Sequence, residues 1–270
     1  MMLVVGVGVL DFMQLLADAA DGLTRDAWLR GGVLVTTKPD GSPVTATDLA
    51  VEVALRDMVR RRFPSDGFLG EEVGSTAGVS GRDWIVDGID GTVAFTQGRR
   101  EWSTLIALAD NGHLVAGLAS SPALSRRWSG AIGAGAEAAT VGELPRRLQV
   151  SDRAALDGAR IVSWPPPGSV ADRFQLAASR LARMCTPATR RPSWDADVPN
   201  GAMLVAEGRL DAFVLFGGEA WDHAACAAIV TTDGGRWSDL DGDERVKQGA
   251  GVYSNGHLHD ALLAALAEPG

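Results

Sequence analysis

The most informative part of the sequence is the stretch Trp84-Ile85-Val86-Asp87-Gly88-Ile89-Asp90-Gly91-Thr92. Its first three residues are apolar and predict a short strand, which ends in two carboxylates three positions apart. The glycines predict a turn, and a helix is expected to begin at Gly91 and Thr92. Carboxylates at a strand end can share a hard cation such as Mg²⁺, and the free N–H groups at a helix start suit a phosphate. Taken alone, the stretch would also fit a solvated Asp-Gly turn.

Two further acidic stretches point to the same chemistry. Glu71 and Glu72 follow the apolar pair Phe68-Leu69, so they would again stand just past a short strand. Asp222 stands at the predicted start of a helix in the second half of the chain. Each stretch alone is more typical of a surface residue or a helix cap. Together they favour one shared site for metal and phosphate.

The hydrophobic spacing predicts alternating helices and strands on both sides of these stretches. The predicted helices cover residues 10–28, 47–63, 171–184, 200–208, 222–233 and 257–267, with Thr47 or Asp48 as the cap of the second. The predicted strands include 104–108 and 114–118 around the turn Asp110-Asn111-Gly112, and also 127–131, 133–139, 160–163 and 212–216. This order predicts a layered α/β protein. A polar stretch near 148–157 is expected to separate an N-terminal half (1–150) from a C-terminal half (151–270).

The composition is that of an ordinary globular protein. The chain has 270 residues, of which 46% are hydrophobic and 22% charged, which excludes a disordered or fibrous protein. Its net charge of −9 argues against nucleic acid or an anionic membrane as the main partner. Cys185 and Cys226 are too few for a disulfide framework, so we expect a cytoplasmic protein with reduced cysteines. The apolar first ten residues lack a basic segment, which predicts a first strand, or an upstream start that is not natural, rather than a signal peptide.

Taken together, the motifs resemble the inositol monophosphatase superfamily. The resemblance rests on Gly70-Glu71-Glu72, on Asp87-x-Ile89-Asp90-Gly91-Thr92, and on Trp221-Asp222-x-Ala224-Ala225 followed by Gly234-Gly235. The segment from Lys38 to Asp48 also resembles the pattern of this superfamily. Softer matches, such as Val205-Ala206-Glu207-Gly208, resemble the bacterial histidinol-phosphate phosphatase branch. The resemblance covers residues 15 to 265 and implies a five-layered αβαβα sandwich of the sugar-phosphatase type.

The resemblance also implies a phosphomonoesterase with two or three Mg²⁺ ions per subunit. Glu71, Asp87 and the backbone carbonyl of Ile89 would hold the first ion. Asp87, Asp90 and Asp222 would hold the second. Two such cations can ligate the phosphate and favour the attack of a water molecule. Relatives are often homodimers, so the resemblance implies a homodimer here.

The catalytic residues implied by the resemblance are Glu71, Thr92 and Asp48. Glu71 and Thr92 would orient the attacking water, and Asp48 would be hydrogen-bonded to the Thr92 hydroxyl. Gly91 and Thr92 would bind the phosphate. The resemblance requires no covalent intermediate.

The sequence departs from the family pattern at several positions. Gly88 stands where the family usually has Pro, Ala94 where it has Asn, and Cys226 where it has Gly. Leu215 stands at the position of a substrate-binding glutamate that many relatives carry. The metal ligands are therefore complete, whereas the side that would bind the alcohol has changed.

The candidate substrate-binding residues reflect this change. They are Asp90, Glu219, Asp222, Asp195 and Trp194, with Glu219 as the substitute for the glutamate replaced by Leu215. Histidinol phosphate is the leading substrate by resemblance to its branch, and the alternative is a sugar, inositol or nucleoside monophosphate of a specialised pathway. A non-catalytic relative that binds a phosphorylated metabolite is disfavoured, because such a protein has no need of a water-orienting Thr–Asp pair.

Overall fold

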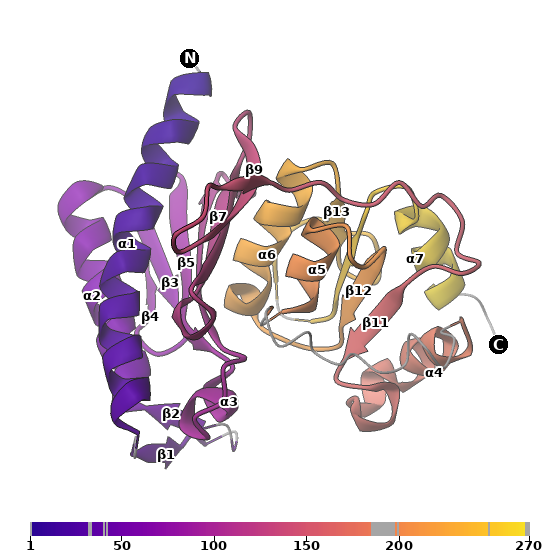
Figure 1. The fold of residues 1–270 in the computed structure, drawn as a ribbon, viewed down its shortest axis with the longest axis horizontal. Coiled ribbons are helices and arrows are strands. Elements are labelled where there is room, and N and C mark those ends of the chain that lie inside the picture. The colour runs from indigo at the N-terminus through magenta and orange to yellow at the C-terminus, as the bar shows by residue number, and fades with distance from the viewer. Residues whose placement is uncertain are drawn as a thin grey trace.

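Helices and strands alternate along the chain (Figure 1). The computed structural model describes residues 2–31, 34–39, 41, 43–184, 198, 200–247 and 249–267. The helices are α1 (Met2–Arg30), α2 (Ala46–Arg62), α3 (Thr92–Thr96), α4 (Gln175–Met184), α5 (Gly201–Ala206), α6 (Ala220–Thr232) and α7 (His259–Ala267). Short 3₁₀ turns cover Pro122–Leu124, Pro167–Ser169 and Asp172–Phe174. The strands are β1 (Val35–Thr37), β2 (Pro43–Thr45), β3 (Gly67–Gly70), β4 (Gly74–Thr76), β5 (Arg82–Asp90), β6 (Ser103–Asp110), β7 (His113–Ser121), β8 (Arg126–Ala131), β9 (Gly135–Thr140), β10 (Arg146–Arg147), β11 (Ile161–Trp164), β12 (Ala212–Leu215), β13 (Arg236–Ser238) and β14 (Gly251–Ser254).

The elements stack in five layers, with α1 and α2 on one outside and α4 and α7 on the other (Figure 1). Next to α1 and α2 lies an eight-stranded sheet in the order β10-β9-β8-β7-β6-β5-β3-β4. Helices α5 and α6 form the middle layer. A four-stranded sheet in the order β11-β12-β14-β13 separates them from α4 and α7. The predicted αβαβα sandwich is therefore confirmed.

Strand pairing within the sheets is mostly antiparallel, whereas β3 pairs with β5 and β11 with β12 in parallel. The β6–β7 hairpin turns at Asn111 and Gly112, whose φ angles are 50° and 80°. Positive φ at both central residues matches the right-handed twist of the flanking strands, and Asn-Gly tolerates it well. The predicted hairpin at this turn is confirmed.

The prediction of a first strand at the N-terminus is wrong. Residues 2–30 form the single helix α1, which extends the predicted helix of residues 10–28 backwards. Val9, Met13 and Leu16 are buried along one face, so the apolar stripe of the helix already begins before residue 10. Each residue added to an existing helix forms one more hydrogen bond, which allows the preceding apolar residues to continue it.

The cap of α2 is Thr45 rather than the predicted Thr47 or Asp48. The Thr45 hydroxyl accepts a hydrogen bond from the backbone N–H of Asp48, and the Asp48 carboxylate accepts one from the Thr45 N–H at 3.0 Å. This reciprocal pair satisfies backbone donors that the first turn of a helix leaves open. It also holds the Asp48 carboxylate in the interior, where it reaches the candidate site.

Hydrophobic clusters fill the spaces between the five layers. The cluster between the two sheets contains residues of both halves, among them Leu105 of β6, Phe213 of β12 and Ile229 of α6. The polar stretch near 148–157 runs between β10 and β11, which belong to different sheets. The N-terminal half therefore contributes the eight-stranded sheet and the small β1–β2 pair, and the C-terminal half contributes the four-stranded sheet. The two larger sheets share a core.

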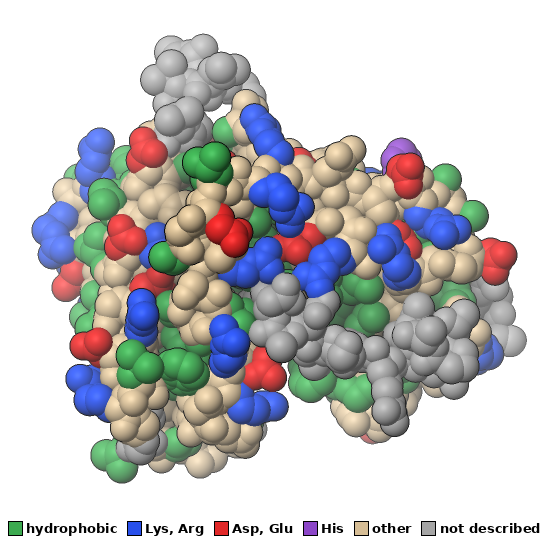
Figure 2. All heavy atoms as spheres, in the orientation of Figure 1, with side chains coloured by type: hydrophobic (Ala, Val, Ile, Leu, Met, Phe, Trp, Pro, Cys, Tyr) green, Lys and Arg blue, Asp and Glu red, His purple; other side chains and the backbone are tan. Residues whose placement is uncertain are grey.

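Basic and acidic side chains are interspersed over the face seen in Figure 2. Some of these charges are structural. Glu207, whose side chain is 2% exposed, lies 2.6 Å from Arg126 and accepts a hydrogen bond from Trp128 at 2.7 Å. These contacts connect β8 to Glu207, the residue that directly follows α5. No helix among the described residues is long and apolar enough to cross a membrane.

Candidate active site

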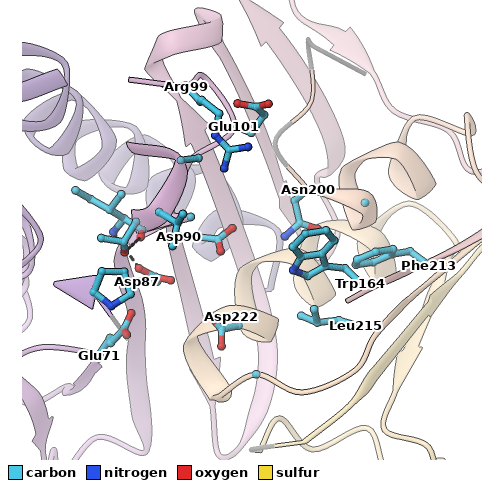
Figure 3. A pocket seen from close by; sticks show the side chains of 18 residues that line it. Glu71, Asp87, Asp90, Arg99, Glu101, Trp164, Asn200, Phe213, Leu215 and Asp222 are labelled. Atoms are coloured by element: carbon cyan, nitrogen blue, oxygen red, sulfur yellow. Dashed lines mark hydrogen bonds between the residues drawn. The ribbon is translucent and has the colours of Figure 1, made fainter. Parts of the chain in front are cut away.

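A cavity of about 590 Å³ lies where β5, α3 and the start of α6 meet the ends of β11 and β12. Figure 3 shows that its two sides differ. One side carries carboxylates, Asp87 and Asp90 among them, and the other carries the apolar side chains of Trp164 and Leu215. Asp222 lies between the two sides.

A bulge in β5 brings Asp87 and Asp90 together. The strand predicted to end in these two carboxylates is β5, which continues through Asp90. In a regular strand, residues three apart point to opposite faces. Here Asp87 pairs with Leu105 but Asp90 with Ser103, so β5 contains one extra residue between the two carboxylates. The bulge turns both carboxylates toward the same cavity.

Asp222 completes a group of three carboxylates. Its oxygen Oδ2 accepts a hydrogen bond from the backbone N–H of Glu219 at 2.7 Å, which orients the side chain at the first turn of α6. One oxygen from each of Asp87, Asp90 and Asp222 lies within 4.8 Å of the others. We call these three residues the acidic cluster. Side chains that offer only oxygen suit a hard divalent cation.

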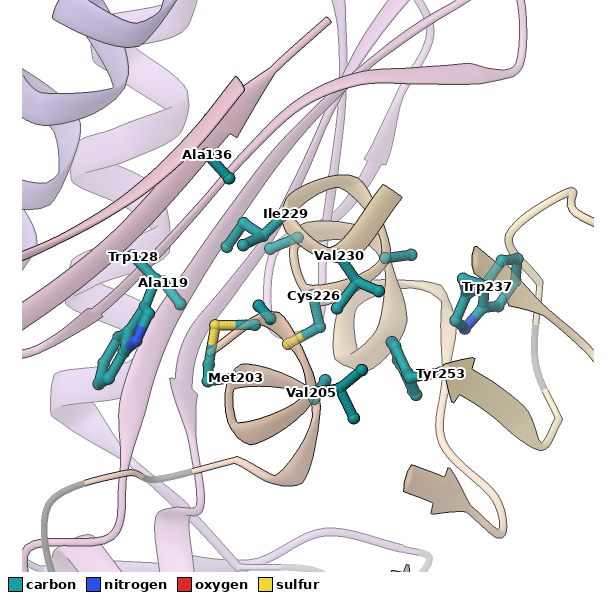
Figure 4. Packing of buried hydrophobic residues seen from close by; sticks show 14 of the residues in the cluster. Ala119, Trp128, Ala136, Met203, Val205, Cys226, Ile229, Val230, Trp237 and Tyr253 are labelled. Atoms are coloured by element: carbon teal, nitrogen blue, oxygen red, sulfur yellow. The ribbon is translucent and has the colours of Figure 1, made fainter. Parts of the chain in front are cut away.

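Helix α6, which carries Asp222, is packed between the two sheets (Figure 4). Its Ile229 belongs to the same buried cluster as Ala136 of β9. On the side of the large sheet, β7 contains a glycine at the point of closest approach. A Cβ on Gly117 would lie 2.4 Å from the carbonyl oxygen of Ala225, so glycine lets the two backbones touch. This packing gives Asp222 a defined position relative to β5.

Burial and mutual repulsion shift the acidic cluster toward the protonated state. Burial, followed by the charges of Glu71, Asp90 and Asp222, raises the pKa of Asp87 well above its ordinary value. Burial raises the pKa of Asp90 to about 6, and burial together with the charge of Asp90 raises that of Asp222 to about 7. A bound cation would favour the charged form of all three carboxylates.

Glu71 also lines the cavity, but its carboxylate is paired with a lysine. The Nζ atom of Lys38 lies 2.5 Å from Oε1 of Glu71 and 2.5 Å from Oε1 of Glu72. Burial would lower the pKa of Lys38, but the hydrogen bonds to the two glutamates outweigh this effect and raise it. Lys38 belonged to a matching segment in the sequence, yet nothing there indicated that it reaches the site.

Glu52 is a buried carboxylate that the sequence analysis missed. It accepts hydrogen bonds from the backbone N–H groups of Glu71 (3.1 Å), Glu72 (2.8 Å) and Val73 (3.0 Å), and from that of Gly88 at 3.4 Å. One side chain of α2 therefore joins the turn after β3 to the bulge of β5. Burial raises the pKa of Glu52 to about 7.

A signal for Glu52 does exist in the sequence. On α2, residues 48, 51, 52, 55 and 59 are the buried ones, so Asp48 and Glu52 occupy the face that packs on the sheet. An acid at such a position needs hydrogen-bond partners, because a buried charge without them is costly. The backbone of Gly88 packs closely against the same two residues. A Cβ on Gly88 would lie 3.0 Å from the carbonyl oxygen of Asp48 and 3.2 Å from Cγ of Glu52.

Thr92 lies at the start of α3 and is connected to Asp48. Its hydroxyl lies 3.2 Å from Oδ1 of Asp48 and 3.0 Å from the carbonyl oxygen of Ile89, so the hydrogen bond to Asp48 that the resemblance implied is present. Gly91 precedes it with a φ of 88°, which favours glycine. A Cβ there would also lie 2.7 Å from the carbonyl oxygen of Glu101.

Of the predicted substrate-binding residues that the structure describes, Asp90 and Asp222 line the cavity. Leu215 lines the cavity, at the position where relatives carry a glutamate. Glu219 follows Gly218, which does line it, but Glu219 itself is not among the described lining residues. Trp194 and Asp195 lie outside the described residues. The substrate-binding roles of Glu219, Trp194 and Asp195 stay predictions.

Other side chains that line the cavity were missed. Asn200 caps α5 by accepting a hydrogen bond from the N–H of Ala202 at 2.9 Å, and its side chain is hydrogen-bonded to Asp90. Arg99 and Glu101 line the cavity on the stretch between α3 and β6. These residues belong to no motif, so sequence spacing alone could not single them out.

Comparisons with known proteins show the family of this chain. The family model for the inositol monophosphatase family matches residues 9–269. The histidinol-phosphatase of Mycobacterium tuberculosis is 40% identical over 256 residues, which cover 93% of this chain and 95% of that protein. The histidinol-phosphatase of Streptomyces coelicolor is 37% identical over 262 residues, 94% of each chain. The structure of an IMPase from Thermotoga maritima has a TM-score of 0.75 and 28% identity, covering 96% of both chains. The chain therefore belongs to the inositol monophosphatase family.

Proposed function

We propose that this protein is a Mg²⁺-dependent phosphatase that hydrolyses histidinol phosphate. Its family makes it a metal-dependent phosphomonoesterase, and the two relatives named above are histidinol-phosphatases. The observation that carries the proposal is the acidic cluster, in which carboxylates from β5 and α6 meet within 4.8 Å.

The donor set fits Mg²⁺. Asp87, Asp90 and Asp222 offer only oxygen ligands, and their raised pKa values mark a concentration of negative charge that a cation would neutralise. We assign Glu71, Asp87 and the Ile89 carbonyl to one ion and the acidic cluster to another, with two or three ions per subunit. When bound, the ions supply positive charge to the phosphate oxygens and lower the pKa of a water molecule.

The remaining chemistry belongs to residues around the cluster. When the Thr92 hydroxyl donates to Asp48, its oxygen lone pairs are left to accept a hydrogen bond from the attacking water. Glu71 lines the same cavity and would accept the second hydrogen bond of that water. The backbone N–H groups of Gly91 and Thr92 would bind the phosphate, which keeps its phosphorus in line with the water.

A sugar, inositol or nucleoside monophosphate is the second candidate substrate. Inositol-1-monophosphatases stand among the relatives, for example that of Mesorhizobium japonicum at 30% identity. Leu215 disfavours a polyol, because an apolar side chain in the cavity offers hydroxyl groups no acceptor. We further propose a homodimer that acts in the cytoplasm, supported by the resemblance to the family and by the low cysteine content.

The experiment that tests this function is a screen of phosphate release across a panel of phosphomonoesters. We expect release from histidinol phosphate in Mg²⁺, loss of release in excess EDTA, recovery when Mg²⁺ is restored, and inhibition by Ca²⁺, which prefers a looser geometry. Full activity in excess EDTA would contradict the metal-dependent mechanism. Release from inositol or sugar phosphates with a higher kcat/KM than from histidinol phosphate would contradict the assigned substrate.

A further inference from the structure

Two apolar side chains lie next to each other on the cavity wall opposite the acidic cluster. Trp164 and Leu215 are the last residues of β11 and β12, which are paired in parallel with these two residues in register. The N–H of Phe216 donates to the carbonyl oxygen of Trp164 at 2.7 Å, which holds the two strand ends together. We call the side chains of Trp164 and Leu215 the ring platform.

The ring platform is accessible from the cavity. Both of its residues line the cavity, and 47% of Trp164 is exposed although most tryptophans of this chain are buried or half-buried. Figure 3 shows Trp164 and Leu215 across from Asp90, with Asp222 between the two sides. A molecule whose phosphate lies at the acidic cluster would therefore extend its alcohol half toward Trp164.

The chemistry of the ring platform selects for a flat, weakly hydrated group. An indole face attracts planar rings by stacking and dispersion, and cationic rings by its quadrupole as well. Leu215 adds apolar surface next to the indole and no hydrogen-bond acceptor. A polyol placed there would lose water from its hydroxyl groups without gaining a hydrogen-bond acceptor from the two side chains of the ring platform.

We propose that the ring platform binds a planar ring in the alcohol half of the substrate, so that the enzyme prefers ring-bearing alkyl phosphates to polyol phosphates. This inference rests on the proposed phosphatase function and adds a specificity-determining residue, Trp164, to it. Asn200, on the same cavity, is already hydrogen-bonded to Asp90 and to the start of α5. The ring platform therefore adds selection by shape and apolar surface on the alcohol side.

The test compares two substrates that differ in the ring and in the methylene that carries it. Histidinol phosphate and ethanolamine phosphate share an amine and a phosphate on a two-carbon unit, and only the first carries an imidazole. We expect Trp164→Ala to raise the KM for histidinol phosphate by roughly three- to tenfold, the range of a typical aromatic contact. The KM for ethanolamine phosphate and both kcat values should change by less than about twofold, which is within the scatter for a residue outside the chemical step.

Two variants serve as controls. Trp164→Phe keeps a flat face and should stay within about threefold of the wild type on histidinol phosphate. Leu176→Ala removes an exposed apolar side chain on α4 that does not line the cavity, and it should leave both substrates unaffected. An equal change in KM for both substrates in Trp164→Ala, or no change for either, would overturn the ring platform.

A binding measurement separates this inference from the proposed function. Calorimetric titration with histidinol, which carries the ring but no phosphate ester, requires no turnover. We expect the affinity for histidinol, measured with Mg²⁺ and inorganic phosphate present, to fall by a similar factor in Trp164→Ala and to be kept in Trp164→Phe. Equal affinity in the wild type and Trp164→Ala would overturn the ring platform. Failure of the wild type to release phosphate from any ester would overturn the proposed function. The histidinol titration of the wild type and Trp164→Ala would still test the ring platform, because it requires no turnover.

Discussion

The two sides of the cavity are built in different ways. The acidic cluster stands on a bulge in the middle of the large sheet and on a helix packed between both sheets, and hydrogen bonds that Glu52 and Asp48 accept support it further. The ring platform stands at the ends of two strands of the small sheet, and Trp164 is about half-exposed. A change in the acidic cluster must disturb many buried partners. Substitutions in the acidic cluster are therefore expected to have larger effects on activity than substitutions in the ring platform.

The largest effect is expected for substitutions in the acidic cluster itself. Asp90→Asn and Asp222→Asn each remove a charged ligand and nearly keep the side-chain volume, so we expect turnover to fall by at least about a hundredfold. Circular dichroism should show a folded protein in both cases. Asp57→Asn, on the outer face of α2, is the matched control and should keep wild-type turnover. Unchanged turnover in the two cluster variants would place the chemistry elsewhere.

A smaller effect is expected for Glu52, which supports the acidic side without lining the cavity. Glu52→Gln replaces an acceptor oxygen with an amide NH₂ that faces backbone N–H groups, which should lower the free energy of unfolding by about 1–3 kcal/mol. Because the turn of Glu71 and the bulge at Gly88 lose their common anchor, the Mg²⁺ concentration for half-maximal activity should rise by about tenfold. Denaturant unfolding and a Mg²⁺ titration of activity measure the two quantities. The exposed Glu143→Gln is the control, and an unaltered Mg²⁺ requirement in Glu52→Gln would contradict the anchoring role.

On the alcohol side, Leu215→Glu should change the choice of substrate rather than the rate of the chemical step. The new carboxylate would offer an acceptor to hydroxyl groups, so we expect kcat/KM for myo-inositol 1-phosphate to rise by about three- to tenfold. Leu215→Met, which keeps an apolar side chain of similar volume, should show no such gain. Steady-state kinetics on inositol and histidinol phosphates measure both. Efficient hydrolysis of inositol phosphate by the wild type would contradict the interpretation that Leu215 disfavours polyols. Efficient here means a kcat/KM near 10⁴ M⁻¹s⁻¹ or above, on the usual enzyme scale of about 10⁴ to 10⁸.

The smallest effect concerns pH and stability on the acidic side. The pKa values of Asp90 and Asp222 are raised to about 6 and about 7 in the folded protein, from about 4 in an unfolded chain. Between pH 4 and 7 the folded state therefore binds more protons than the unfolded state, and the metal-free protein loses stability as the pH rises through this window. Mg²⁺ binds the deprotonated carboxylates, so the increase in Tm that it causes should be greater at pH 8 than at pH 5, by about 5 °C. Thermal unfolding in EDTA and in Mg²⁺ measures the difference, and an equal increase at both pH values would contradict the assignment.

Much of the acidic side could be predicted from the sequence. Asp87, Asp90 and Asp222 stand in short motifs whose residue types reveal their chemistry, and the glycine next to Thr92 marks the backbone turn that follows β5. The direction of the carboxylates was not predictable in the same way. A spacing of three would separate Asp87 from Asp90 in a regular strand, and the bulge that unites them is defined only by the pairing with β6.

Less of the alcohol side could be predicted. Trp164 follows a short apolar run with no motif, and it reaches the cavity because β11 pairs with β12 in a register that places it beside Leu215. The roles of Glu52 and Lys38 at the site were not predicted, for a related reason. Each contacts a turn that lies far away in sequence, and nothing near either residue records that contact.

The sequence by itself determined the residue types at the site, most helices and strands, and the family to which the chain belongs. Those features depend on short-range spacing and on backbone preferences of single residues, and both can be read along the chain. The tertiary structure decided that residues 2–9 continue a helix, that two aspartates share one face, and that an exposed indole lies opposite them. These features depend on strand register and on burial, which arise only when distant segments pack together.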